Sequence, residues 1–182
     1  MLGADQAWKM LNEADLVCSA ETVSTAVARL ADEISAALGD QYPLVLAVMG
    51  GSVYFAGNLL PRLRFPIEFD FIHASRYGDA STAGSITWRA EPRDNVKNRV
   101  VLVLDDILDG GDTLFAVRER VIGLGAKACY TAVLTDKNTG NAKPIHADFV
   151  GISIPDRFVF GCGMDAHGAW RNLPAIYAMK GS

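Results

Sequence analysis

The chain has 182 residues, of which 50% are hydrophobic and 21% charged, so it is long and apolar enough to bury one sizeable core. This composition excludes intrinsic disorder and argues against a second independent domain. The chain has 17 Lys and Arg residues and 21 Asp and Glu residues, with no long run of either charge. We therefore expect no nucleic-acid partner. No apolar run approaches the ~18 residues that a membrane span needs, so we expect no membrane partner and no export signal.

Cysteine usage indicates a reducing compartment. Cys18, Cys129 and Cys162 are odd in number and widely spaced, with no CxxC pair and no neighbouring histidine cluster of metal-ligand spacing. We therefore expect three reduced thiols in a cytoplasmic protein.

The N-terminal part of the chain has helical periodicity, which predicts helices over residues 5–16 and 20–38. Ser19 is the expected N-cap of the second helix and Gly39 its expected C-cap. Five short, nearly continuous apolar runs follow, at residues 44–49, 67–72, 100–104, 128–134 and 149–154. Such runs are typical of strands that are buried on both faces of a parallel sheet.

Helical segments at residues 53–63 and 113–123 alternate with these strands. The alternation predicts an α/β fold with an open, mainly parallel, twisted sheet and helices on both faces. Ligands of such sheets bind beyond the carboxyl ends of the strands. Residues 75–98 interrupt the pattern, since they are rich in Ser, Thr, Gly and Asp apart from a short alternating piece at 85–88. A long segment of this kind is typical of a functional lid or a disordered loop.

The most informative stretch is a strand end at residues 100–114. Asp105 and Asp106 follow the apolar strand, and Asp109 precedes a Gly-Gly turn and a helix start. A glycine turn at a helix N-terminus presents backbone N–H groups to a phosphate. Two more carboxylates would repel a phosphate alone, but they accept hydrogen bonds from vicinal hydroxyls and can hold Mg²⁺. The pattern indicates a ribose 5-phosphate with Mg²⁺, whereas an Asp109 that only caps the helix would leave two carboxylates unexplained.

This stretch resembles the signature of the type I phosphoribosyltransferases, in which two acidic residues at a strand end precede a D-x-G-x-T phosphate loop. The resemblance implies that Asp105 and Asp106 bind the ribose and a magnesium ion and that Asp109 is the general base. It implies that the phosphate is held by Gly110, Gly111, Asp112 and Thr113. It also implies that the fold adds a small hood subdomain and a mobile active-site loop to the sheet.

Further segments between about residues 22 and 179 resemble the hypoxanthine-guanine phosphoribosyltransferase family. The resemblance implies a cis Met49–Gly50 peptide bond whose backbone binds pyrophosphate, and a Lys137 that donates to the 6-oxo group of a purine. In the C-terminal part, the implied roles are stacking on the purine for Phe158, backbone contacts to the purine edge for Val159, contacts to the purine and to a second magnesium for Asp165, and a pyrophosphate contact for Arg171.

Several positions depart from the family pattern. Arg76 and Tyr77 stand where the mobile loop commonly has Ser-Tyr, so the tyrosine matches and the serine does not. Gly50 replaces a frequent lysine and Gly110 a threonine, and Asp112 adds negative charge where a neutral or basic residue is frequent. The affinity for the ribosyl donor is therefore left open.

The sequence thus predicts one domain over residues 1–182, with N-terminal helices at 5–38, a mobile loop at about 75–98 and a C-terminal purine-binding hood at about 149–182. The predicted activity is the Mg²⁺-dependent transfer of phosphoribose from phosphoribosyl pyrophosphate to hypoxanthine or guanine in purine salvage, by a homodimer or homotetramer. Two alternatives stay open. An RNA-binding regulator on the same fold is disfavoured by the pI of 5.3, and an inactive nucleotide-binding homologue is kept open by the departures at Gly110 and Asp112.

Overall fold

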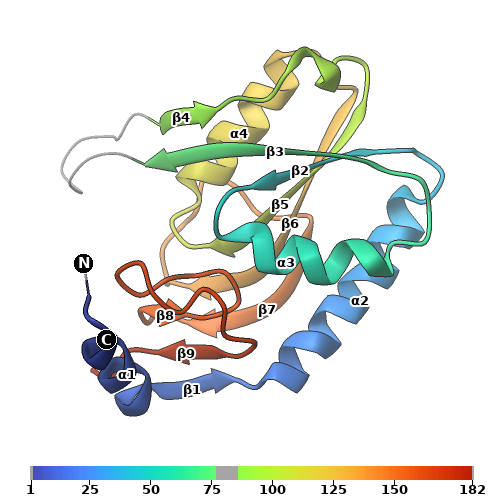
Figure 1. The fold of residues 1–182 in the computed structure, drawn as a ribbon. Helices are drawn as coiled ribbons and strands as arrows, with labels where there is room; N and C mark the ends of the chain where they lie inside the picture. The colour runs from blue at the N-terminus through green and yellow to red at the C-terminus, as the bar shows by residue number, and fades with distance from the viewer. Residues whose placement is uncertain (1, 77–85, 182) are drawn as a thin grey trace.

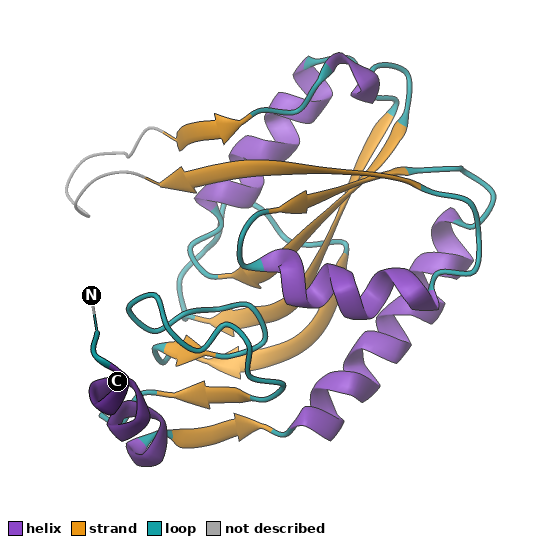
Figure 2. Ribbon diagram, viewed as in Figure 1, coloured by secondary structure: helices purple, strands orange, loops and turns teal. Residues whose placement is uncertain are grey.

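The computed structural model describes residues 2–76 and 86–181 (Figure 1). Its larger sheet has six strands in the order β4-β3-β2-β5-β6-β7, and every neighbouring pair is parallel except β3 and β4. These strands are β2 (Leu44–Val48), β3 (Glu68–Arg76), β4 (Ile86–Ala90), β5 (Val100–Leu108), β6 (Ala128–Asn138) and β7 (Phe149–Pro155). The predicted α/β fold with an open, mainly parallel sheet is confirmed (Figure 2).

Helices cover both faces of this sheet, as predicted. On one face lie α2 (Ala20–Leu38) and α3 (Ser52–Leu59), which continues into the 3₁₀ turn η1 (Leu60–Arg62), and on the other lies α4 (Asp112–Gly123). Successive strand residues divide between two buried clusters: Val45, Ala47, Leu102 and Leu104 pack with α2 and α3, and Leu44, Leu46, Val101 and Val103 pack with α4. This alternation explains why the strands are apolar throughout.

The N-terminal region differs from its prediction. The helix expected over residues 5–16 is α1 (Ala4–Glu13), and it is followed by a short strand, β1 (Asp15–Cys18). Ala14 has an extended backbone, and β1 pairs antiparallel with β9 (Ile176–Ala178), so long-range pairing overrides the local periodicity. By contrast, α2 has the predicted bounds, and the Ser19 hydroxyl accepts a hydrogen bond from the Thr22 N–H at 3.1 Å.

A second, three-stranded sheet has the order β1-β9-β8, with β8 spanning Val159–Phe160. The strand β7, which lies within the segment assigned to the hood, belongs to the larger sheet, and the small sheet takes one strand from the N-terminal part of the chain. The segment 75–98 is partly regular, because β4 pairs antiparallel with β3, and the turn η2 (Asp94–Val96) follows. Ile86 and Trp88 pack against the core, and Tyr77 lies outside the described residues.

Strand order places a topological switch point between β2 and β5. The chain leads from β2 through α3 to β3 on one side, and from β5 through α4 to β6 on the other. The carboxyl ends of β2 and β5 therefore diverge into a crevice, the usual ligand site of such sheets. Within the described ranges, no helix combines the length and the apolar character that crossing a membrane demands.

Candidate functional site

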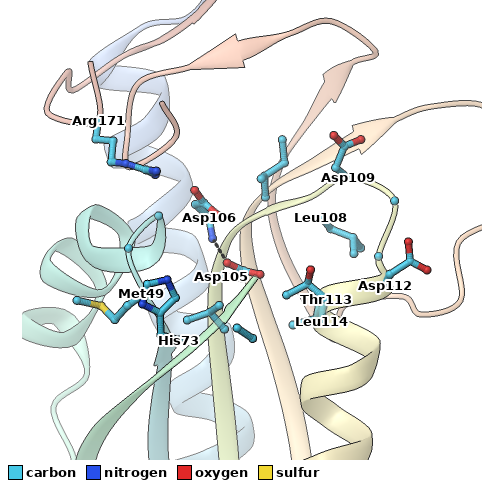
Figure 3. Close-up of a pocket in the computed structure, with 17 residues that line it drawn as sticks. Met49, His73, Asp105, Asp106, Leu108, Asp109, Asp112, Thr113, Leu114 and Arg171 are labelled. Atoms are coloured by element: carbon cyan, nitrogen blue, oxygen red, sulfur yellow. Dashed lines mark hydrogen bonds between the residues drawn. The ribbon is translucent and has the colours of Figure 1, made fainter. Parts of the chain in front are cut away.

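A cavity of about 450 Å³ lies at the switch point (Figure 3). It is lined by the turn after β2, the end of β3, the end of β5 with the start of α4, and Arg171 from the C-terminal loop. The predicted residues that it brings together are Met49, Gly50, Asp105, Asp106, Asp109, Gly110, Gly111, Asp112, Thr113 and Arg171. The Met49–Gly50 peptide bond is cis, as the resemblance implied.

The turn between β5 and α4 forms a backbone cradle. Gly111 is the N-cap of α4 with φ of 91°, a left-handed conformation that favours glycine, and no side chain caps the helix there. The first N–H groups of a helix lack intrahelical acceptors and carry partial positive charge, so this turn suits an anionic group. Asp109 does not cap α4; its carboxylate lies 2.9 Å from the Lys137 Nζ.

Asp105 and Asp106 lie inside β5, because the strand continues four residues beyond its predicted end. Burial, and next the negative charge of Asp106, raise the pKa of Asp105 well above its ordinary value. Burial also raises the pKa of Asp106, against the opposing effect of the Arg171 charge. Figure 3 shows both carboxylates between Met49 and the start of α4, with Arg171 pointing toward them. Two adjacent acids, of which Asp105 is buried and Asp106 partly buried, favour a cation or hydroxyl donors in this cavity.

The acidic pair also fits a magnesium ion. Across residues 2–76 and 86–181, no group of three or more His, Cys, Asp and Glu side chains forms a ready-made metal site. Mg²⁺, however, is typically held by one or two carboxylates together with phosphate oxygens of the substrate. Asp105 and Asp106 are such a pair beside a phosphate cradle.

The C-terminal loop closes on the turn after β2 through a tight backbone contact. Gly163 has φ of 103°, and a β-carbon there would collide with the carbonyl of Gly51. Arg171 fixes this loop, because its Nη1 donates to the Gly163 carbonyl at 2.7 Å and its Nη2 lies 2.5 Å from Asp165. Arg171 and Asp165, predicted as separate ligands, therefore form an ion pair at the edge of the cavity.

A second cavity of about 310 Å³ adjoins the first and shares part of its lining. It brings together all four residues predicted to bind a purine, which are Lys137, Phe158, Val159 and Asp165. Phe158 is 45% exposed and its ring stacks on that of His167 with the centroids 6.1 Å apart, whereas Val159 is buried in β8. The Lys137 side chain is only 11% exposed, and it meets Asp109 where the two cavities join.

Sequence reasoning missed several site residues. His73 lines the first cavity, but the strand that carries it was predicted to end at Ile72. Ile107 and Met164 line the second cavity, and their apolar side chains have no local signal that separates them from the core. Arg76 ends β3.

Comparisons with known proteins agree with this geometry. A family model described as phosphoribosyl transferase domain matches residues 19–167. The chain is 32% identical to a hypoxanthine-guanine phosphoribosyltransferase of Bacillus subtilis over 91% of this chain and 92% of that protein, and 30% identical to a hypoxanthine-guanine-xanthine phosphoribosyltransferase of Tritrichomonas foetus over 89% of each. A crystal structure of a hypoxanthine-guanine phosphoribosyltransferase from Bacillus anthracis superposes with a TM-score of 0.82 at 30% identity, covering 90% of this chain and 96% of that one.

Proposed function

The chain belongs to the phosphoribosyltransferase family, and on that premise we propose that it transfers phosphoribose from phosphoribosyl pyrophosphate to hypoxanthine or guanine. The products are IMP or GMP and pyrophosphate, in a Mg²⁺-dependent step of purine salvage. The observation that carries this proposal is the pair formed by Asp109 and Lys137, 2.9 Å apart at the junction of the two cavities.

This pair matches one edge of a 6-oxopurine. N7 and the 6-oxo oxygen occupy neighbouring positions on that edge, so two adjacent side-chain heads can face both. The Lys137 ammonium has donors only and suits the oxo group, and the Asp109 carboxylate accepts the N7 proton. Phe158 supplies an aromatic face for stacking, and backbone groups near Val159 and Asp165 face the 2-position. Adenine presents a 6-amino donor to Lys137 and should be rejected.

The first cavity suits the ribosyl donor. Its 5-phosphate lies in the cradle at residues 109–113, and its ribose hydroxyls face Asp105 and Asp106. The pyrophosphate group lies beside the backbone of Met49 and Gly50, within reach of Arg171. Asp105 and Asp106 would hold a Mg²⁺ ion and Asp165 would help to hold a second one, and the metal would supply positive charge to neutralise the leaving pyrophosphate.

The reaction exchanges one bond at the ribose C1. The bond from C1 to the pyrophosphate oxygen breaks, the purine N9 forms the new bond to C1, and the N7 proton passes to the Asp109 carboxylate. Positive charge develops on the ribose, and the acidic pair beneath it stabilises that charge electrostatically.

A homo-oligomer, dimer or tetramer, is part of the proposal. Phe69 and Phe71 are 51% and 46% exposed and lie on one face of β3, opposite Ile72 and Ala74, which are buried. Paired exposed aromatic rings are typical of a surface that a partner covers. The three cysteines carry free thiols, and we place the protein in the cytoplasm, where thiols stay reduced.

The direct test is a steady-state assay with guanine, phosphoribosyl pyrophosphate and Mg²⁺, in which GMP and pyrophosphate are both quantified. Equal amounts of the two products, abolished by excess chelator and restored by Mg²⁺, are expected. No turnover at all would point instead to an inactive nucleotide-binding homologue, and donor consumption without GMP would show hydrolysis of the donor in place of transfer to the purine.

A further inference from the structure

Lys143, in the loop between β6 and β7, has a largely buried side chain although it belongs to a polar segment. Its side chain is 9% exposed. The Lys143 Nζ lies 2.7 Å from the carbonyl oxygen of Leu108, 2.7 Å from the carbonyl oxygen of Lys137, and 2.6 Å from the Asp136 Oδ1. An ammonium group has three N–H donors, so all of them are used within the protein. Lys143 therefore keeps no donor for a substrate.

The three acceptors lie where β5 and β6 separate. The last register pair of these parallel strands joins Leu108 to Asp136. The next residue in each case is a proposed purine-contacting residue: Asp109 directly follows the end of β5, and Lys137 lies on β6. Beyond Leu108 and Asp136 the backbone hydrogen bonds between β5 and β6 no longer fix the distance between the two strand ends. The Lys143 ammonium joins them at that point, because it contacts the carbonyl oxygens of both Leu108 and Lys137.

We propose that Lys143 is a positioning residue that holds Asp109 and Lys137 side by side, so that one purine edge meets both groups. This inference rests on the proposed function and deepens it. Asp136 neutralises the Lys143 ammonium. Lys143 can therefore orient the two strand ends without adding a net charge to the site. The three Nζ contacts of Lys143 go to Leu108, Asp136 and Lys137, which lie on the purine side of the site, so the donor subsite should be independent of Lys143.

The test compares purine use with donor binding in Lys143→Met, which keeps the length of the side chain and removes its ammonium. We expect kcat/KM for guanine to fall by roughly 10²-fold, the loss that a displacement of about 1 Å in a reacting group produces. The Kd of phosphoribosyl pyrophosphate with Mg²⁺, measured by calorimetry, should stay within a few-fold of wild type. The preference for guanine over adenine should shrink, because Lys137 no longer faces the oxo group at a fixed distance.

Lys127→Met is the matched control, since Lys127 is an exposed lysine that precedes the other end of β6, and it should leave all three quantities unchanged. Chemical rescue separates positioning from general stability. A cavity of about 360 Å³ borders Lys143, so added ethylammonium should enter Lys143→Ala and restore part of its guanine efficiency. If Lys143→Met does not fold, Lys143→Gln, which keeps an amide donor, serves for the same comparison.

Three outcomes decide the inference. Unchanged guanine efficiency in Lys143→Met, with an active wild type, would overturn it. Equal losses in donor affinity and guanine efficiency, without rescue, would show a merely structural lysine and would overturn it as well. If the wild type itself forms no GMP, the proposed function fails, and the positioning role falls with it.

Discussion

Asp109 is the exposed partner of an ion pair whose other member, Lys137, is largely buried. We expect Asp109→Asn to lower kcat by at least ~10²-fold, because general base catalysis contributes on that scale. Donor affinity should stay within a few-fold, since an amide keeps the shape of the carboxylate. Single-turnover rates should be compared, because slow product release could hide the effect in steady-state data. An unchanged single-turnover rate would remove Asp109 from the mechanism.

The fold disfavours the charged form of Asp105. Its pKa is raised by burial and by Asp106, so between the unfolded and folded pKa values the native state binds more protons than the unfolded state. Stability contributed by this group is therefore lost as the pH rises through that interval. Asp105→Asn keeps an oxygen for the Asp106 N–H, bonded at 3.0 Å, and should raise the Tm at pH 7 by roughly 2–4 °C.

The gain in Tm should disappear in acid, where the native carboxyl is already protonated, and the same variant should lose donor binding in the presence of Mg²⁺. Thermal unfolding at several pH values, with calorimetry of the donor, measures both. A variant less stable than wild type at pH 7 would show that the charge is stabilised by its surroundings.

Among the elements, α1 has no buried residues, yet it contacts the loop that carries Arg171. The Trp8 and Trp170 rings meet edge to face at 5.0 Å, and the Trp170 Nε1 donates to the Ala7 carbonyl at 2.9 Å. Trp170 has φ of 71°, a conformation that needs support from its surroundings. Trp8→Ala should therefore loosen the loop that carries Arg171 and raise the KM for the donor by up to ~10-fold. This factor corresponds to the interaction free energy of one aromatic pair.

The matched control on the same helix is Lys9→Ala, because Lys9 is exposed and its ion pair with Glu13 is long, at 4.0 Å. Its donor KM should equal that of the wild type. An unaltered donor KM in Trp8→Ala would mean that α1 only covers the loop without supporting it.

Sequence signals predicted the elements that depend on local pattern. The helix α2 and the parallel strands carry periodicity or continuous apolar runs. The strands β1, β8 and β9 have two to four residues each and pair only with distant segments, so no window of sequence marks them. In the site, residues at strand ends were predicted from residue type and family resemblance. Lys143 was not, because one of its acceptors is 35 residues away and a buried lysine looks like a solvated one in sequence.

At the scale of the whole molecule, the exposed face of β3 should mediate self-association. Phe71→Glu places a charge on that face while Ile72, which packs in the core, is untouched. We expect the variant to shift toward monomer in light scattering at micromolar concentration. Phe115→Glu, at a ring that is 42% exposed on α4, is the control and should leave the mass of the wild type. A monomeric wild type, or an oligomer unaffected by Phe71→Glu, would contradict the assignment of this face.

The measurement that tests the central claim most directly is a competition among bases. The wild-type protein is given limiting phosphoribosyl pyrophosphate, Mg²⁺ and equal amounts of guanine, hypoxanthine, xanthine and adenine, and the nucleotides formed are quantified together. GMP and IMP should dominate, less XMP should form, and AMP should be rarer by at least ~10²-fold, because the Lys137 donor meets another donor, the 6-amino group, on adenine. Dominant AMP, or no nucleotide at all, would contradict a 6-oxopurine phosphoribosyltransferase.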